Sequence, residues 1–259
     1  MPIHYEQDGT IITITIDRPE AHNALDEEHS AALGQAFERF RNNATAHVAI
    51  LTGTGPHAFC AGGDLKRMLP ARRSSALAGG GLGPSLGGIT RAPFIEKPLI
   101  AAINGDCIGG GLEIALCCDF RLAVPHARFG FPEVRWGILP GAGGTQRLPR
   151  TIGISHALYL LLTGALITAE QALAWGLITS TIPASSLREE ALQLAHHLAA
   201  LAPLALRALK HAIYEGIEQP LATGLQLEEE LATTILQTAD AAEGLHAFAE
   251  KRSAHFHGQ

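Results

Sequence analysis

The sequence predicts an α/β protein with one large domain, residues 1–184, followed by a helical region, residues 185–259. Short strand-like apolar stretches alternate with segments of helical periodicity through the first two thirds of the chain. From about Ser185 onward Ala, Leu, Glu and Gln dominate, and no further strand pattern occurs. The apolar faces of those last helices need a partner, which is either the body of the protein or another subunit.

The first predicted strand and helix lie near the N-terminus. Isoleucines alternate at a period of two over residues 12–16, before Asp17-Arg18-Pro19 ends the strand. Asp26 then offers a carboxylate to cap a helix. That helix has an apolar stripe of core character, formed by Leu33, Phe37 and Phe40.

Further elements follow from similar patterns. Residues 48–51 and 99–103 are short apolar strands that run into glycine, and turns of this kind tend to carry function. Thr168-Ala169-Glu170-Gln171 has the pattern of a capping box opening a short helix, which Gly176 ends. Residues 177–182 are predicted to form a strand.

Composition and charge limit the kind of protein. The chain has 259 residues, 47% of them hydrophobic, and a formal net charge of −6, which gives no general attraction for nucleic acid or anionic membranes. The N-terminus has no signal-peptide pattern, so a cytoplasmic location is expected. The four cysteines have neither zinc-like spacing nor a disulfide pattern, so no metal site and buried free thiols are expected.

Two small-residue turns are candidates for chemistry. Residues 59–65 and 108–113 each place glycines just before an expected helix, where free backbone N–H groups point outward. Two such turns can supply two donors to one oxygen and so form an oxyanion hole. Taken one at a time, each glycine run is better explained as an ordinary tight turn.

Two glutamates follow residues that hold the backbone still. Glu113 comes after Gly109-Gly110-Gly111-Leu112, and Glu133 comes after Phe131-Pro132. Adding or removing water requires one group that takes a proton and another that gives one, and a pair of carboxyl groups can do both. The sequence alone leaves alternatives open, because Glu113 fits a helix N-terminus and Glu133 fits a solvated partner of Arg135.

The chain resembles the enoyl-CoA hydratase/isomerase (crotonase) superfamily along nearly its whole length. Four motifs occur in the family's order, and together they are specific. They are Ala61-Gly62-Gly63-Asp64-Leu65, the run from Lys97 to Gly105, Gly109-Gly110-Gly111-Leu112-Glu113, and Pro132-Glu133 through to Gly141-Ala142-Gly143-Gly144-Thr145-Gln146-Arg147-Leu148.

The resemblance implies a crotonase-type spiral of ββα units and a C-terminal helical region that builds trimers or hexamers. It implies that the amides of Gly63 and Gly110 hold the thioester oxygen of an enoyl-CoA. Glu113 would activate water and Glu133 would protonate the alpha carbon, although these roles could be reversed or shared. Gly141, taken as the start of a helix, would help to position the water through its N–H.

Coenzyme A is expected as part of the substrate, with no permanently bound cofactor and no nucleic-acid or membrane partner. The resemblance implies CoA contacts along one stretch of backbone, with Lys66 and a neighbouring subunit's Lys251 as candidates for the phosphates. For each lysine a solvated surface charge is the alternative. The implied backbone contacts are Ala24, Ala61, Asp64 and Leu65.

The sequence says less about the pocket that would bind the acyl group of the substrate. Residues 67–95 form a long glycine-rich connection, in which residues 78–88 look mobile. Trp136 is expected in the core, with the acyl pocket as the alternative, while Arg72 and Arg73 fit a solvated loop better than a substrate carboxylate. Because both glutamates match the family's hydratases, the resemblance favours a hydratase over an isomerase or decarboxylase of the family. The resemblance also associates the chain with fatty-acid β-oxidation, while the sequence leaves the pathway itself open. An RNA-associated binding protein is the remaining alternative, which the net charge disfavours.

Overall fold

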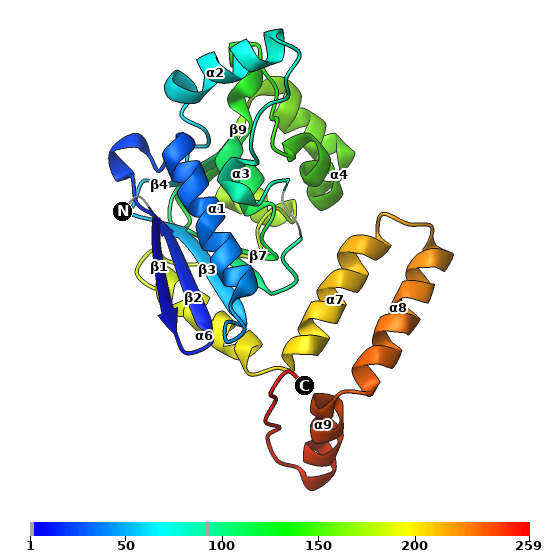
Figure 1. The fold of residues 1–259 in the computed structure, drawn as a ribbon. Coiled ribbons are helices and arrows are strands. Elements are labelled where there is room, and N and C mark those ends of the chain that lie inside the picture. The colour runs from blue at the N-terminus through cyan, green and yellow to red at the C-terminus, as the bar shows by residue number, and fades with distance from the viewer. Residues whose placement is uncertain (1–2, 92–93) are drawn as a thin grey trace.

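The computed structural model describes residues 3–91 and 94–259 as two β-sheets surrounded by helices, with three helices extending away from that body (Figure 1). The larger sheet has the order β1-β2-β3-β5-β7-β10; β1 pairs antiparallel with β2, and the other neighbours are parallel. Its strands are β1 (Ile3–Asp8), β2 (Ile11–Ile16), β3 (Val48–Gly53), β5 (Leu99–Ile103), β7 (Phe120–Ala123) and β10 (Ser180–Thr181).

The smaller sheet has the order β4-β6-β8-β9, in which only the last pair is antiparallel. The chain repeatedly places one strand in the larger sheet, the next in the smaller sheet, and then forms a helix. This repetition is the predicted spiral of strand-strand-helix units, so the predicted fold class is confirmed. The strands of the smaller sheet are β4 (Ala58–Cys60), β6 (Asp106–Ile108), β8 (Arg128–Gly130) and β9 (Leu166–Thr168).

Helix α1 (Glu27–Asn42) begins as predicted. The Asp26 carboxylate accepts a hydrogen bond from the backbone N–H of His29, and the expected apolar stripe is buried against the sheet. The α1 helix also contacts the short 3-10 helix η2 (Leu86–Gly88), because neither Gly34 nor Gly88 has a side chain to separate them. The end of the supposedly mobile segment is therefore packed, and the preceding connection contains α2 (Leu65–Leu77).

Between β8 and the C-terminal helices, one local prediction is confirmed and two are wrong. The capping box at Thr168 is present and opens α5 (Ala169–Ala174), as expected. The following strand is shorter than predicted, because only β10 (Ser180–Thr181) pairs with β7. Trp136 is 55% exposed and does not lie in the core.

The C-terminal region is helical from Leu187, as predicted from about Ser185. Helix α6 (Leu187–Ala199) packs on the larger sheet, where Ala191 and Ala195 are buried. The division into two domains stays a prediction. Helices α7 (Pro203–Gly216), α8 (Leu221–Leu236) and α9 (Ala239–Glu250) extend from the body (Figure 1), and no residue of α8 is buried.

The extended helices are joined to the body through Lys210 of α7. Its ammonium donates hydrogen bonds to the Asp119 carboxylate at 2.8 Å and to the carbonyl of Lys97 at 3.0 Å. The four cysteines are free thiols, as predicted; Cys60, Cys107 and Cys118 are buried, whereas Cys117 is only partly buried. None of the helices within residues 3–91 and 94–259 combines the length and apolar character needed to cross a membrane.

Candidate functional site

The first glycine turn links β4 to α2. Gly62 has a φ of +91°, a conformation that side-chain-bearing residues rarely adopt, and Gly63 follows it. Asp64 then caps α2 by accepting a hydrogen bond from the N–H of Arg67. A side chain on Gly62 would put its Cβ 2.7 Å from the backbone nitrogen of Gly110, so this turn lies directly against the second glycine turn.

The second turn links β6 to α3 (Gly110–Ala115), and Gly109 enters it with a φ of +55°. A Cβ on Gly110 would lie 3.3 Å from the backbone nitrogen of Gly63, while one on Gly111 would collide with the Cys60 carbonyl oxygen. Glycine is therefore required for the two turns to approach each other. The structure brings the Gly63 and Gly110 amides to one place.

Glu113 is carried by α3 into the interior and is 3% exposed. Its Oε1 accepts hydrogen bonds from two backbone N–H groups, those of Ala142 at 2.7 Å and Gly144 at 2.8 Å. Burial raises the pKa of Glu113 above its ordinary value, while these two hydrogen bonds and then the charges of Arg147 and Arg91 act in the opposite direction. The two amides thus favour the carboxylate form of a buried acid.

Glu133 lies in the short 3-10 helix η3 (Pro132–Trp136) and is 8% exposed. Its Oε2 has no hydrogen-bond partner among the described residues. Burial is the main cause that raises the pKa of Glu133 to about 7, and the negative charge of Glu113 adds to it. A Cβ on Gly109 would lie 2.6 Å from Glu133 Oε1, so the second glycine turn contacts both acids.

Gly141 directly precedes Ala142, whose N–H reaches Glu113, but Gly141 is not the first residue of a helix. Helix α4 (Gly144–Thr163) begins three residues later, and residues 141–143 form a turn. The N–H groups that reach Glu113 belong to Ala142 and Gly144, which the sequence reasoning missed. The only local signal for them is the run of small residues from Gly141 to Gly144, which lets the backbone come close to a buried carboxylate.

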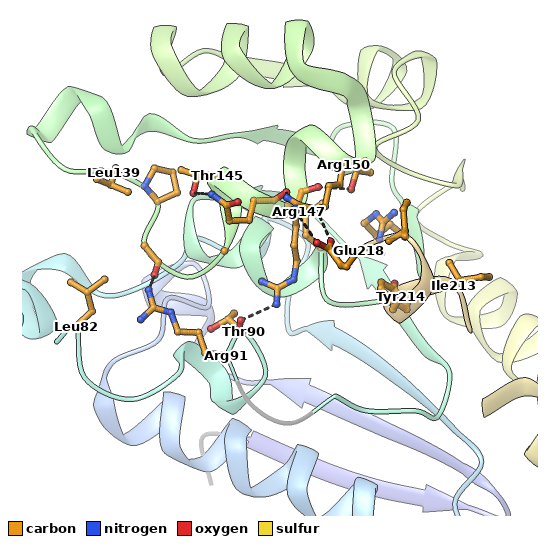
Figure 2. A pocket seen from close by; sticks show the side chains of 18 residues that line it. Leu82, Thr90, Arg91, Leu139, Thr145, Arg147, Arg150, Ile213, Tyr214 and Glu218 are labelled. Carbon is orange, nitrogen blue, oxygen red and sulfur yellow. Dashed lines mark hydrogen bonds and ion pairs between the residues drawn. The ribbon is translucent and has the colours of Figure 1, made fainter. Parts of the chain in front are cut away.

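A cavity of about 690 Å³ adjoins this turn, between α4 and α7 (Figure 2). Four arginines line it: Arg91 from the loop after η2, Arg121 from β7, and Arg147 and Arg150 from α4. Arg91 donates a hydrogen bond to the carbonyl of Gly141, and Arg147 donates to the carbonyls of Thr90 at 2.9 Å and Ala142 at 3.3 Å. Arg91 and Arg147 therefore fix the turn that holds Glu113, and they make its surroundings positive.

The residues expected to contact CoA lie together, with one exception. Leu25 forms a bridge with Gly63, because its N–H donates to the Gly62 carbonyl at 2.7 Å and its own carbonyl accepts from Asp64. This pairing places Ala24 beside the first glycine turn. Ala61, Asp64, Leu65 and the exposed Lys66 follow on that turn and on the start of α2.

Lys251 is the exception. It ends α9 in a left-handed conformation, and α9 lies at the opposite end of the molecule from α2 (Figure 1). The carboxylate of Asp64 is not available to a ligand, because it forms an ion pair with Arg18 at 3.0 Å. Its side chain therefore serves the turn, and its backbone is paired as well, because the N–H donates to Leu25 and the carbonyl accepts from Met68 at 2.8 Å.

A spiral of ββα units with two buried acids behind paired glycine turns defines a crotonase-fold acyl-CoA enzyme. The family model described as "Enoyl-CoA hydratase/isomerase" matches residues 6–259. The chain belongs to the enoyl-CoA hydratase/isomerase family, whose members use CoA thioester substrates.

Individual relatives agree with this assignment. The chain is 40% identical to an (E)-benzylidenesuccinyl-CoA hydratase of Thauera aromatica, over 100% of both chains. It is 39% identical to a carnitinyl-CoA dehydratase of Salmonella typhi, covering 97% of this chain and 96% of that one. The crystal structure of an enoyl-CoA hydratase from Bacillus anthracis superposes with a TM-score of 0.90 at 36% identity, covering 100% of each chain.

Proposed function

We propose that the protein is an enoyl-CoA hydratase, which reversibly adds water across the double bond of a 2-enoyl-CoA. The observation that carries the proposal is the asymmetry of the two buried acids. Glu113 accepts two backbone hydrogen bonds that favour its charged form, whereas Glu133 has an oxygen with no partner among the described residues and a pKa raised to about 7. A base and an acid side by side are what hydration requires.

In the proposed mechanism the thioester oxygen accepts hydrogen bonds from the amides of Gly63 and Gly110. Glu113 takes a proton from water while the water oxygen bonds to the beta carbon, and the electron pair of the double bond moves toward the thioester oxygen. The two amides stabilise the resulting enolate, which is typically worth about 2–4 kcal/mol per donor. Glu133 then gives its proton to the alpha carbon, and the N–H of Gly141 helps to position the water.

The proposed CoA site extends along the backbone of Ala24, Ala61, Asp64 and Leu65, with Lys66 near the phosphates. The proposal includes a homotrimer or a hexamer, in which Lys251 of one subunit reaches the CoA of another. Apolar side chains on the extended helices support such an assembly, since Leu221 of α8 and Phe248 of α9 are 78% and 86% exposed. The names of the two curated relatives, a hydratase and a dehydratase, support chemistry with water over isomerisation.

Substitution of each acid tests the mechanism. We expect Glu113→Gln and Glu133→Gln each to lower kcat by roughly two to four orders of magnitude, because each removes one proton-transfer step. Binding of a saturated acyl-CoA, measured by calorimetry, should stay near the wild-type value. Glu170→Gln, at an exposed glutamate in the first turn of α5, is the matched control and should keep full activity.

Two results would contradict the proposal. Wild-type turnover in either acid variant would mean that the glutamate concerned takes no part in the chemistry. A purified protein that moves the double bond of a 3-enoyl-CoA, but hydrates neither straight-chain nor branched 2-enoyl-CoA, would be an isomerase instead.

A further inference from the structure

Arg72 on α2 is a half-buried guanidinium without an acidic partner among the described residues. Its neighbours differ in this respect. Arg67, five residues earlier on the same helix, pairs with Asp26 at 2.8 Å, and Arg18 pairs with Asp64. A cation that lines a cavity without a carboxylate partner is available to pair with an anionic ligand.

Two cavities meet at Arg72. The first, the α1–α2 cavity, has a volume of about 540 Å³ and is lined by residues that include Met68, Arg72 and Leu82. Met68 connects this cavity to the first glycine turn, because its sulfur lies 3.4 Å from where a Cβ on Gly63 would be. The α1–α2 cavity therefore begins beside the proposed oxyanion hole and has room for an acyl group.

The second cavity, the Gly141 cleft, has a volume of only about 10 Å³, which is room for about one water molecule, and is lined by residues that include Arg72, Arg91, Gly141 and Ala142. The N–H of Ala142 donates to Glu113, so the cleft reaches the backbone that holds one of the two acids. Arg72 thus lines both the large cavity and the cleft beside the backbone that holds Glu113.

The charges in these two cavities are uneven. The Gly141 cleft has two arginines and, among the described residues that line it, no acidic side chain. The α1–α2 cavity has one acid, Glu27, which is exposed in the first turn of α1, where the helix dipole stabilises it. A ligand that fits has an apolar stem along Met68 and Leu82 and a negative charge at Arg72.

We infer that the acyl group of this enzyme's CoA thioester carries a second carboxylate, and that Arg72 binds it. The inference rests on the proposed function and names its substrate class. A guanidinium can bind a carboxylate through two parallel hydrogen bonds, which favours this anion over an uncharged acyl end. The phosphates of CoA are the other anions of the substrate, and the experiment separates the two.

The test compares glutaconyl-CoA, which has a free carboxylate, with its methyl ester, which has the same carbon chain without the charge. Hydration is followed by the loss of ultraviolet absorbance of the conjugated thioester. We expect the wild-type kcat/KM to favour the acid by about 10- to 100-fold, as the loss of one charge-assisted hydrogen-bonding pair implies. Arg72→Gln should reduce this preference to about twofold or less. Arg73→Gln, at the exposed neighbouring residue, should leave it intact.

The possible failures are distinguishable. A wild-type enzyme that hydrates both compounds equally well would overturn the inference and leave the proposed hydratase function in place. An Arg72→Gln variant that loses activity equally on both would assign Arg72 to the CoA phosphates and overturn it as well.

A second measurement does not depend on hydration. Saturated glutaryl-CoA and its methyl ester are titrated into the full-length protein by calorimetry, with the same two variants. Tighter binding of the acid that disappears in Arg72→Gln supports the inference even if no substrate is hydrated. Equal binding of the two compounds by the wild-type protein overturns it.

Discussion

Replacing Glu133 by glutamine should change how the stability of the protein depends on pH. The side chain is buried, and the pKa of Glu133 rises from an ordinary value of 4.5 to about 7 on folding. Below pH 4.5 the carboxyl group is protonated in both the folded and the unfolded chain. Between pH 4.5 and 7 the unfolded chain loses this proton first, so the folded state becomes progressively less favourable. Above pH 7 the loss is complete.

The magnitude follows from the size of that rise. Each pKa unit corresponds to about 1.4 kcal/mol, so a pKa raised from 4.5 to about 7 means a loss of about 3 kcal/mol of unfolding free energy at alkaline pH. Glutamine has no such titration. Its amide must also fit where Oε2 has no partner in the described part of the chain, which costs about 1–3 kcal/mol at every pH. The prediction therefore concerns how the difference in unfolding free energy between Glu133→Gln and wild type changes with pH.

Urea unfolding at a fixed protein concentration, from pH 5 to pH 8.5, measures this difference. The unfolding free energy of Glu133→Gln, relative to wild type, should rise by about 2–3 kcal/mol across the range. Glu170→Gln, at the exposed glutamate, should show no such trend. A difference between Glu133→Gln and wild type that is constant with pH, or that falls as pH rises, would refute the reasoning, because it would mean that Glu133 is not held in its neutral form.

Three further predictions concern Glu133, the glycine turn beside it, and the ion pair that joins α7 to the body. Above about pH 7, where Glu133 loses its proton, kcat/KM should fall in parallel for hydration and for dehydration. The two must fall together because water carries no charge, so the hydration equilibrium does not depend on pH. Stopped assays of both directions across the pH range check this. Gly109→Ala should lower kcat by about 100-fold, because its Cβ would lie 2.6 Å from Glu133 Oε1. Gly9→Ala, with the same φ of +55° but open space around it, should not affect kcat. Lys210→Met should lower the unfolding free energy by about 3–5 kcal/mol, measured by urea unfolding, because Asp119 is left partly buried without its cation.

Local chemistry made much of the fold predictable from the sequence. The Asp26 cap and the capping box at Thr168 depend on residues within one turn of each other, and both occur as predicted. Strand β1 was missed because only Ile3 of its six residues is buried, so its sequence has little apolar alternation. The strand predicted over residues 177–182 was too long because its apolar start packs in the core without pairing.

The candidate site was less predictable, because its contacts join distant parts of the chain. The glycine turns and both acids are visible in the sequence, but the amides of Ala142 and Gly144 lie about 30 residues from Glu113. No local pattern marks such a cap. Trp136 was placed in the core from its residue type alone, whereas η3 turns it outward while burying Glu133 on the other side.

The difference between the two acids therefore originates in the backbone and not in the residue type. Glu113 and Glu133 are the same amino acid, both are buried, and desolvation raises the pKa of each. They differ in their contacts. The Glu113 carboxylate accepts hydrogen bonds from the amides at the start of α4, whereas the Glu133 carboxyl group lies against Gly109, and its Oε2 has no hydrogen-bond partner among the described residues. In the proposed reaction, the assignment of base and acid is thus made by the turns around the pair. Substitutions in those turns should exchange or blur the two roles without touching either glutamate.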